Sequence, residues 1–145
     1  MNRKLVRVLA ISILPSFVVA LVFYFLLGYR RDYLGHYAAG YGGTLCATMI
    51  VLFIIPTTLY RRVASMVVVG STILCIAAGA IAEATVFRIA KFDEIDFCNQ
   101  SLGAVLAGLA VIVFASELKP DDTAIRSAVA IGAIFLTAGA YFAFT

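Results

Sequence analysis

Apolar residues fill five long runs of the chain, and short polar connections separate them. The runs cover residues 8–28, 37–60, 63–87, 98–116 and 127–144. A helix needs about 20 mostly apolar residues to cross the hydrocarbon core of a bilayer, and each run is close to that length or exceeds it. The pattern therefore predicts an all-α, polytopic membrane helix bundle with five transmembrane helices, forming a single transmembrane domain.

The connections between the runs are short, so consecutive helices are expected to be antiparallel neighbours. Along the chain they read YRRDYLGH, RR, RIAKFDEID and ELKPDDTAIR. Pro15 and Pro56 fall inside predicted runs, where a proline can kink a transmembrane helix while neighbouring groups bond to the freed backbone.

Composition and the placement of positive charge both agree with a membrane protein. Of the 145 residues, 63% are hydrophobic and 13% are charged, against about 25% charged residues in soluble domains. One side of the predicted bundle carries Arg3, Lys4, Arg7, Arg61, Arg62, Lys119 and Arg126, and the other carries Arg30, Arg31, Arg88 and Lys91. The side richer in Lys and Arg usually faces the cytoplasm, so we expect a cytoplasmic N-terminus and a C-terminus outside.

Ionisable and amide side chains gather on the predicted outer side. They are Asp32, His36, Glu83, Asp93, Glu94, Asp96, Asn99 and Gln100. Glu83 lies about one turn inside the outer end of the third helix, where a carboxylate is costly unless it faces the bundle interior or finds a partner. Because short loops bring the second, third and fourth helices together, we expect these groups to share a polar pocket at the outer membrane interface.

Roles can be assigned to six of these residues and to Arg88, which lies on the same side. Glu83 and His36 are the candidate catalytic, acid–base pair, and the candidate ligand-binding residues are Asp32, Arg88, Asp96, Asn99 and Gln100. Each of the main residues also has a structural alternative. Glu83 is then an interfacial acid reaching back to water, Asp96 or Asp93 caps the fourth helix, and His36 is a solvated helix-end residue.

No sequence motif identifies a type of reaction. The chain contains no HExxH, GxSxG or glycine-rich phosphate loop. Cys46, Cys75 and Cys98 form no CxxC pair and no Cys/His metal spacing. We therefore expect neither a metal nor a cofactor. Nucleic-acid binding has no support, because the sequence has no basic cluster. Whether the chain is an enzyme stays open.

Residues 30–110 resemble the VanZ-like family of small bacterial integral membrane proteins. The resemblance is carried by Asp32 and His36 in DYLGH, by Glu83 in AEATVF, by Arg88 or Lys91, and by Asp96, Asn99 and Gly103 in DFCNQSLG. The chain departs from the family pattern at Val86, where the family has Gln, and in the spacing from Asp96 to Asn99. The resemblance implies a protein of the bacterial cytoplasmic (inner) membrane with a role in the cell envelope, near lipid-linked cell-wall or polysaccharide material.

Three functions are compatible with these features. The leading hypothesis is a small cell-envelope protein whose outer-face pocket engages a membrane lipid or a lipid-linked glycan by its head group. The first alternative is a structural or accessory subunit of a larger membrane complex, with other membrane proteins as partners. The second is a small oligomeric transporter, although five spans do not divide into two equal repeats.

Overall fold

The computed structural model of the chain is a bundle of five helices, which confirms the all-α prediction. The structure describes residues 3–26, 28, 31–85, 92–115 and 119–144. The helices are α1 (Arg3–Leu26), α2 (Arg31–Ile54), α3 (Thr57–Thr85), α4 (Glu94–Ala115) and α5 (Asp122–Phe144).

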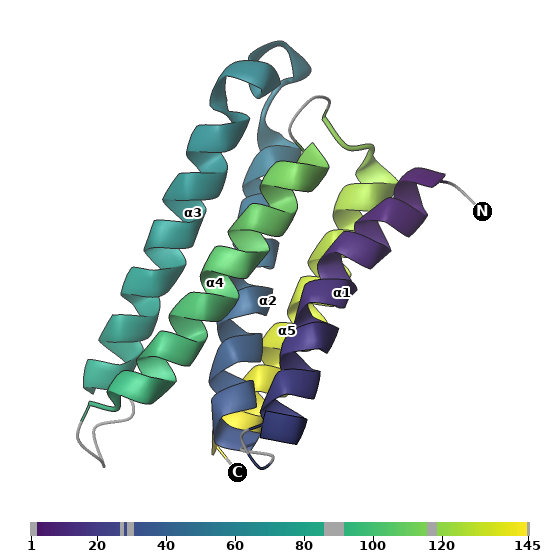
Figure 1. The fold of residues 1–145 in the computed structure, drawn as a ribbon. Coiled ribbons are helices and arrows are strands. Elements are labelled where there is room, and N and C mark those ends of the chain that lie inside the picture. The colour runs from purple at the N-terminus through teal and green to yellow at the C-terminus, as the bar shows by residue number, and fades with distance from the viewer. Residues whose placement is uncertain (1–2, 27, 29–30, 86–91, 116–118, 145) are drawn as a thin grey trace.

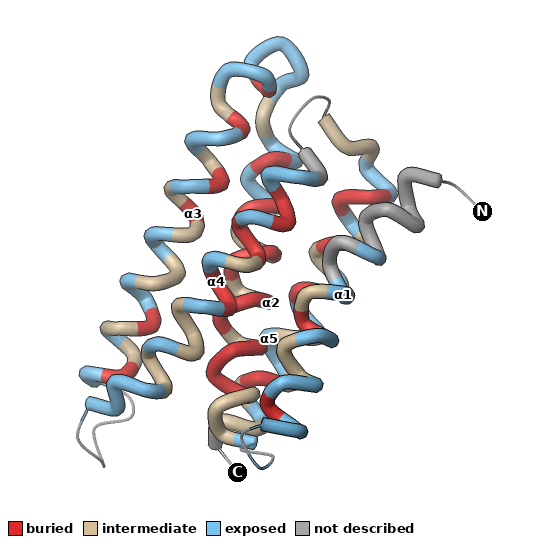
Figure 2. Tube along the Cα trace, in the orientation of Figure 1, coloured by how far each residue is buried: buried red, intermediate tan, exposed pale blue. Residues whose placement is uncertain are grey.

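Helix α2 occupies the centre of the bundle, with α3 and α4 on one side and α1 and α5 on the other (Figure 1). It contacts all four other helices, most extensively α5 and α4, and buried residues line much of its length (Figure 2). The chain changes direction at each connection, so α2 and α4 begin at the end of the bundle where α1, α3 and α5 finish. The two chain termini consequently lie at opposite ends.

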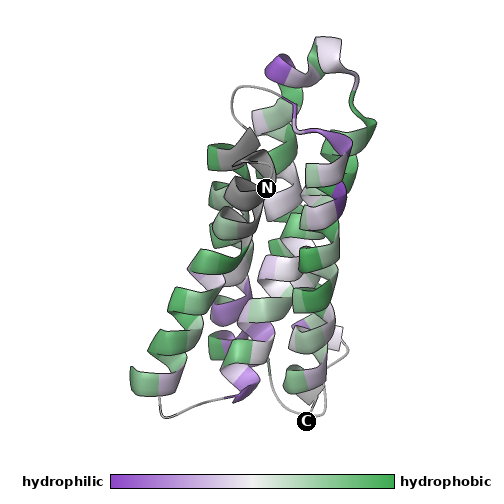
Figure 3. Cartoon of the chain, turned by 90° about the vertical axis from the view of Figure 1, so that its right-hand side faces the viewer, coloured by the Kyte–Doolittle hydropathy of each residue, from purple (hydrophilic) through white to green (hydrophobic). Residues whose placement is uncertain are grey.

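Four helices, α2 to α5, are long and apolar enough to cross a membrane. In α1 the apolar stretch found among the described side chains, Ile13–Leu26, is shorter. Large hydrophobic side chains are exposed on the bundle, with Phe25 and Met66 both 73% exposed and Leu74 71% exposed. Figure 3 shows that apolar residues occur along the length of the helices. Such a surface fits a protein surrounded by acyl chains rather than by water.

The structure corrects the predicted boundary between the second and third helices. The sequence placed the turn at Arg61 and Arg62, but α2 ends at Ile54 and α3 begins at Thr57, so both arginines lie in the second turn of α3. Pro56 causes the break, because proline has no N–H to donate and disfavours a helical conformation in the residue before it.

Lys119 satisfies the carbonyl groups that this break exposes. Its Nζ donates to the carbonyl oxygens of Phe53 at 2.9 Å and Ile55 at 2.7 Å. The last carbonyls of a helix have no partner within the helix, and a cation there also interacts favourably with the helix dipole. Close by in sequence, the Asp121 carboxylate accepts a hydrogen bond from the Ala124 amide at 2.8 Å and so caps α5.

Glycines allow α2 and α4 to approach closely. A Cβ atom on Gly40 would collide with the backbone carbonyl of Gln100, and one on Gly103 would collide with the backbone carbonyl of Tyr37. Gly40 lies on α2 and Gly103 on α4, so each helix presents a glycine to the backbone of the other. Small residues at such crossings let helices pack by van der Waals contact where no hydrophobic force drives them together.

This contact predicts a difference between two glycine-to-alanine substitutions. Gly103→Ala places a methyl group against a backbone atom of α2, and we expect it to cost about 1–3 kcal/mol, as overpacking typically does. Gly70→Ala adds a methyl group where nothing lies within 4 Å. The midpoint of its thermal unfolding in detergent should therefore equal that of the unaltered protein or be slightly higher. Equal midpoints for the two variants would contradict the close α2–α4 contact.

Candidate functional site

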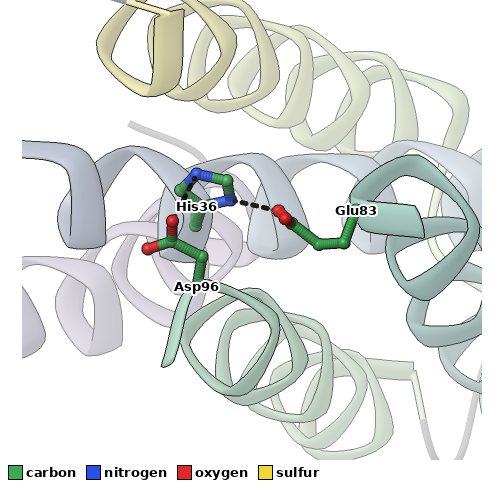
Figure 4. A group of neighbouring side chains, drawn as sticks. All are labelled: His36, Glu83 and Asp96. Carbon is green, nitrogen blue, oxygen red and sulfur yellow. Dashed lines mark ion pairs between the residues drawn. The ribbon is translucent and has the colours of Figure 1, made fainter. Parts of the chain in front are cut away.

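Three ionisable side chains from three helices meet near one end of the bundle (Figure 4). His36 lies in the second turn of α2, Glu83 near the end of α3 and Asp96 in the first turn of α4. The His36 Nδ1 atom is 3.3 Å from Glu83 Oε1, and its Nε2 atom is 3.4 Å from Asp96 Oδ2. The imidazole ring therefore has one carboxylate at each nitrogen; we call these three residues the His36 cluster.

Burial shows that the His36 cluster belongs to the bundle interior. His36 is 7% exposed and Glu83 4% exposed, and Asp96 is half-buried. These values rule out, for the described structure, that Glu83 reaches back to water or that His36 is a solvated end residue. Buried charged groups are stable only when they are paired or bind an ion, and the imidazole supplies a partner to both carboxylates.

Asp93 rather than Asp96 caps α4. The Asp93 Oδ1 atom accepts hydrogen bonds from the backbone amides of Ile95 at 2.8 Å and Asp96 at 3.2 Å. The alternative in which the Asp96 side chain serves as the N-cap is therefore wrong. Because the capping task falls to Asp93, the Asp96 carboxylate faces His36, at a helix N-terminus whose partial positive charge favours a carboxylate.

Gln100 joins α4 to α3 and lies about one helical turn after Asp96 along α4. Its Nε2 atom donates to the carbonyl oxygen of Cys75 at 3.1 Å. Gly79 on α3 makes room for this side chain, because a Cβ atom there would collide with the Gln100 amide. The structure thus places Gln100, predicted to bind ligand, in a contact that fixes the spacing of the helices carrying Glu83 and Asp96.

The other predicted ligand-binding residues lie around the His36 cluster or beyond the described chain. Asp32 is half-buried in the first turn of α2, one turn before His36. Asn99 follows Asp96 by three residues on α4, and its buried Nδ2 atom has no hydrogen-bond partner among the described residues. Arg88 lies outside the described residues.

The His36 cluster has a property that the sequence did not reveal. One ligand atom from each of its three residues can be chosen so that all lie within 4.8 Å of one another, and such a group can hold a metal ion. No local motif announces it, because each residue comes from a different helix; only the helix topology brings the three together. An imidazole can also give and take a proton, so the arrangement suits general acid–base chemistry as well.

Comparison with protein-family models, with curated proteins and with solved structures found no match for this chain. Function is therefore argued from the residues of the His36 cluster and their surroundings.

The capping assignment predicts different effects for two substitutions of one residue. Asp93→Ala removes the acceptor of two backbone amides and should destabilise the protein by about 1 kcal/mol. Asp93→Asn keeps a side-chain oxygen at the cap and should cost far less. Thermal unfolding of both variants in one detergent measures the difference, and an equal loss in the two would show that capping by Asp93 contributes nothing.

Proposed function

We propose that this chain is a small, five-span cell-envelope protein of the VanZ-like type, integral to the bacterial cytoplasmic membrane. In this proposal it engages the head group of a lipid or lipid-linked glycan at its outer face. The observation that carries the proposal is the meeting of His36, Glu83 and Asp96 at one end of an otherwise apolar bundle. Ionisable residues within membrane helices are expensive, and they commonly mark functional sites.

The chemistry around the His36 cluster suits a polar head group. The two carboxylates can accept hydrogen bonds from sugar hydroxyl groups, and the imidazole can donate a proton or accept one. Asn99 Nδ2 adds a hydrogen-bond donor that has no partner among the described residues, on the same face of α4 as Asp96. Donors and acceptors thus lie next to one another, as recognition of a phosphate or a sugar requires.

Position in the bundle supports the same assignment. His36 and Asp96 lie within the first two turns of α2 and α4, and Glu83 lies within the last turn of α3. If these helices span the membrane, the His36 cluster sits near the level of the head groups. In the proposed orientation this is the outer side, and the acid–base pair of Glu83 and His36 faces molecules that arrive from the outer leaflet.

The proposed orientation predicts the outcome of two reporter fusions. Alkaline phosphatase, which is active only outside the cytoplasm, should be active when fused after Thr145 and inactive when fused within the connection at Pro120. Normalised enzyme activity in whole cells measures this. The opposite pattern would invert the orientation, and equal activity at both positions would refute a membrane crossing by α5.

Head-group binding can be tested with a polyprenyl-phosphate-linked sugar as the probe, because the Glu83 carboxylate can accept hydrogen bonds from sugar hydroxyl groups. Glu83→Gln removes a charged hydrogen-bonding partner from the His36 cluster, and such losses amount to about 1.5–3 kcal/mol, or roughly 10- to 100-fold in affinity. Native mass spectrometry of the purified protein with the probe measures the bound fraction. Glu94→Gln, an identical chemical change at an exposed position of α4, should bind as the unaltered protein does. Equal binding by both variants and the unaltered protein would remove the site assignment.

A further inference from the structure

We propose that the His36 cluster binds one divalent transition-metal ion, and that zinc is the ion it fits. His36, Glu83 and Asp96 are the protein ligands. The inference deepens the proposed function and rests on it for the ion's role, because a metal at this place would contact the phosphate or hydroxyl oxygens of the head group. Occupancy by the metal, however, can be measured without any head group.

Distances in the His36 cluster allow its three side chains to share one ion. Atoms that share a tetrahedral zinc at about 2.0–2.2 Å are about 3.3–3.6 Å apart. The separation of His36 Nδ1 from Glu83 Oε1 is 3.3 Å and lies in that range, whereas a charge-assisted hydrogen bond between such groups is typically about 2.7–2.9 Å. Asp96 Oδ2 faces the other ring nitrogen, 3.4 Å from Nε2, and only one imidazole nitrogen can bind a given ion. Because one ligand atom from each residue lies within 4.8 Å of the other two, side-chain rotation can bring both carboxylates to an ion on one ring nitrogen.

Charge supplies a second argument for a cation. Two carboxylates face one imidazole, so ionised carboxylates leave the three groups with a net negative charge whether or not the ring is protonated. Glu83 and His36 are almost completely buried, and a carboxylate in such surroundings is neutralised either by a proton or by a cation. A dication bound by a neutral imidazole and two carboxylates neutralises the group.

The identity of the ligand atoms selects the class of metal. Imidazole nitrogen favours zinc and other transition metals, whereas magnesium and calcium prefer sites made entirely of oxygen atoms. One nitrogen and two carboxylate oxygens therefore favour zinc over magnesium or calcium. Three protein ligands also leave a fourth position open, which in zinc sites holds water or a substrate oxygen.

The surrounding helices hold the three ligands in place before any ion arrives. Asp93 caps α4 and thereby leaves Asp96 to face the ring. Gln100 ties α4 to α3 through Cys75, and the glycine contact of α2 with α4 sets the third side of the site. Metal sites that are supported in this way lose less entropy on binding, because the ligands are already positioned.

The test uses the full-length protein in mild detergent, stripped of metal with a chelator. Titration with zinc, followed by calorimetry and by elemental analysis after gel filtration, should show about one ion per chain, and magnesium or calcium should bind far more weakly. Glu83→Gln and His36→Asn should weaken zinc binding by roughly tenfold or more, while Glu94→Gln should not change it. Zinc bound equally by all four proteins, or by none of them, would overturn the proposal.

X-ray absorption spectroscopy of the zinc-loaded, unaltered protein keeps the test decisive if a variant fails to fold. We expect nitrogen and oxygen neighbours at about 2.0–2.2 Å, and a sulfur neighbour, which would place the ion at a cysteine, would contradict the assignment. The two proposals also fail separately. Binding of the lipid-linked sugar that depends on Glu83 but not on zinc would refute the metal's role in head-group binding, and zinc binding without head-group binding would refute the proposed function.

Discussion

A carboxylate buried among apolar helices has to be paired, and in this protein one histidine pairs two of them. His36 lies between Glu83 and Asp96, with each ring nitrogen facing one carboxylate oxygen. The pairing connects α2, α3 and α4 at one end of the bundle. It therefore holds three helices together and also brings the ionisable side chains of the candidate site next to one another. Removing His36 takes from both carboxylates the ring nitrogen that faces them, and buried ionisable groups of this kind commonly mark functional sites.

Close packing of the helix backbones makes that pairing geometrically feasible. Gly40 and Gly103 bring α2 against α4, and Gly79 admits the Gln100 side chain between α4 and α3. With bulkier residues at these positions the helices would separate, and the carboxylates of α3 and α4 would move away from the imidazole on α2. The small residues within the helices therefore allow the close packing that fixes the distances between His36 and the two carboxylates.

The sequence predicted the helical architecture and the meeting of the three helix ends, because run length and short connections are local properties of the chain. It did not place the break at Pro56, because only the weakly polar Thr57 and Thr58 follow that proline, and the charged Arg61 and Arg62 gave the stronger signal of a connection. It offered both Asp93 and Asp96 as caps, and only the backbone geometry separates them. The hydrogen bond of Gln100 between helices and the metal-binding capacity of the His36 cluster both join residues on different helices. Spacing along the chain does not predict such contacts.

His36 is the only histidine in the chain, so nitrogen NMR of protein labelled at histidine reports on this ring alone. The most direct measurement compares the two ring-nitrogen shifts in the metal-free protein and in two variants. If the ring lies between the carboxylates, Glu83→Gln shifts mainly the Nδ1 signal and Asp96→Asn mainly the Nε2 signal. Ring signals that are unchanged by both substitutions would show that His36 does not lie between these two residues.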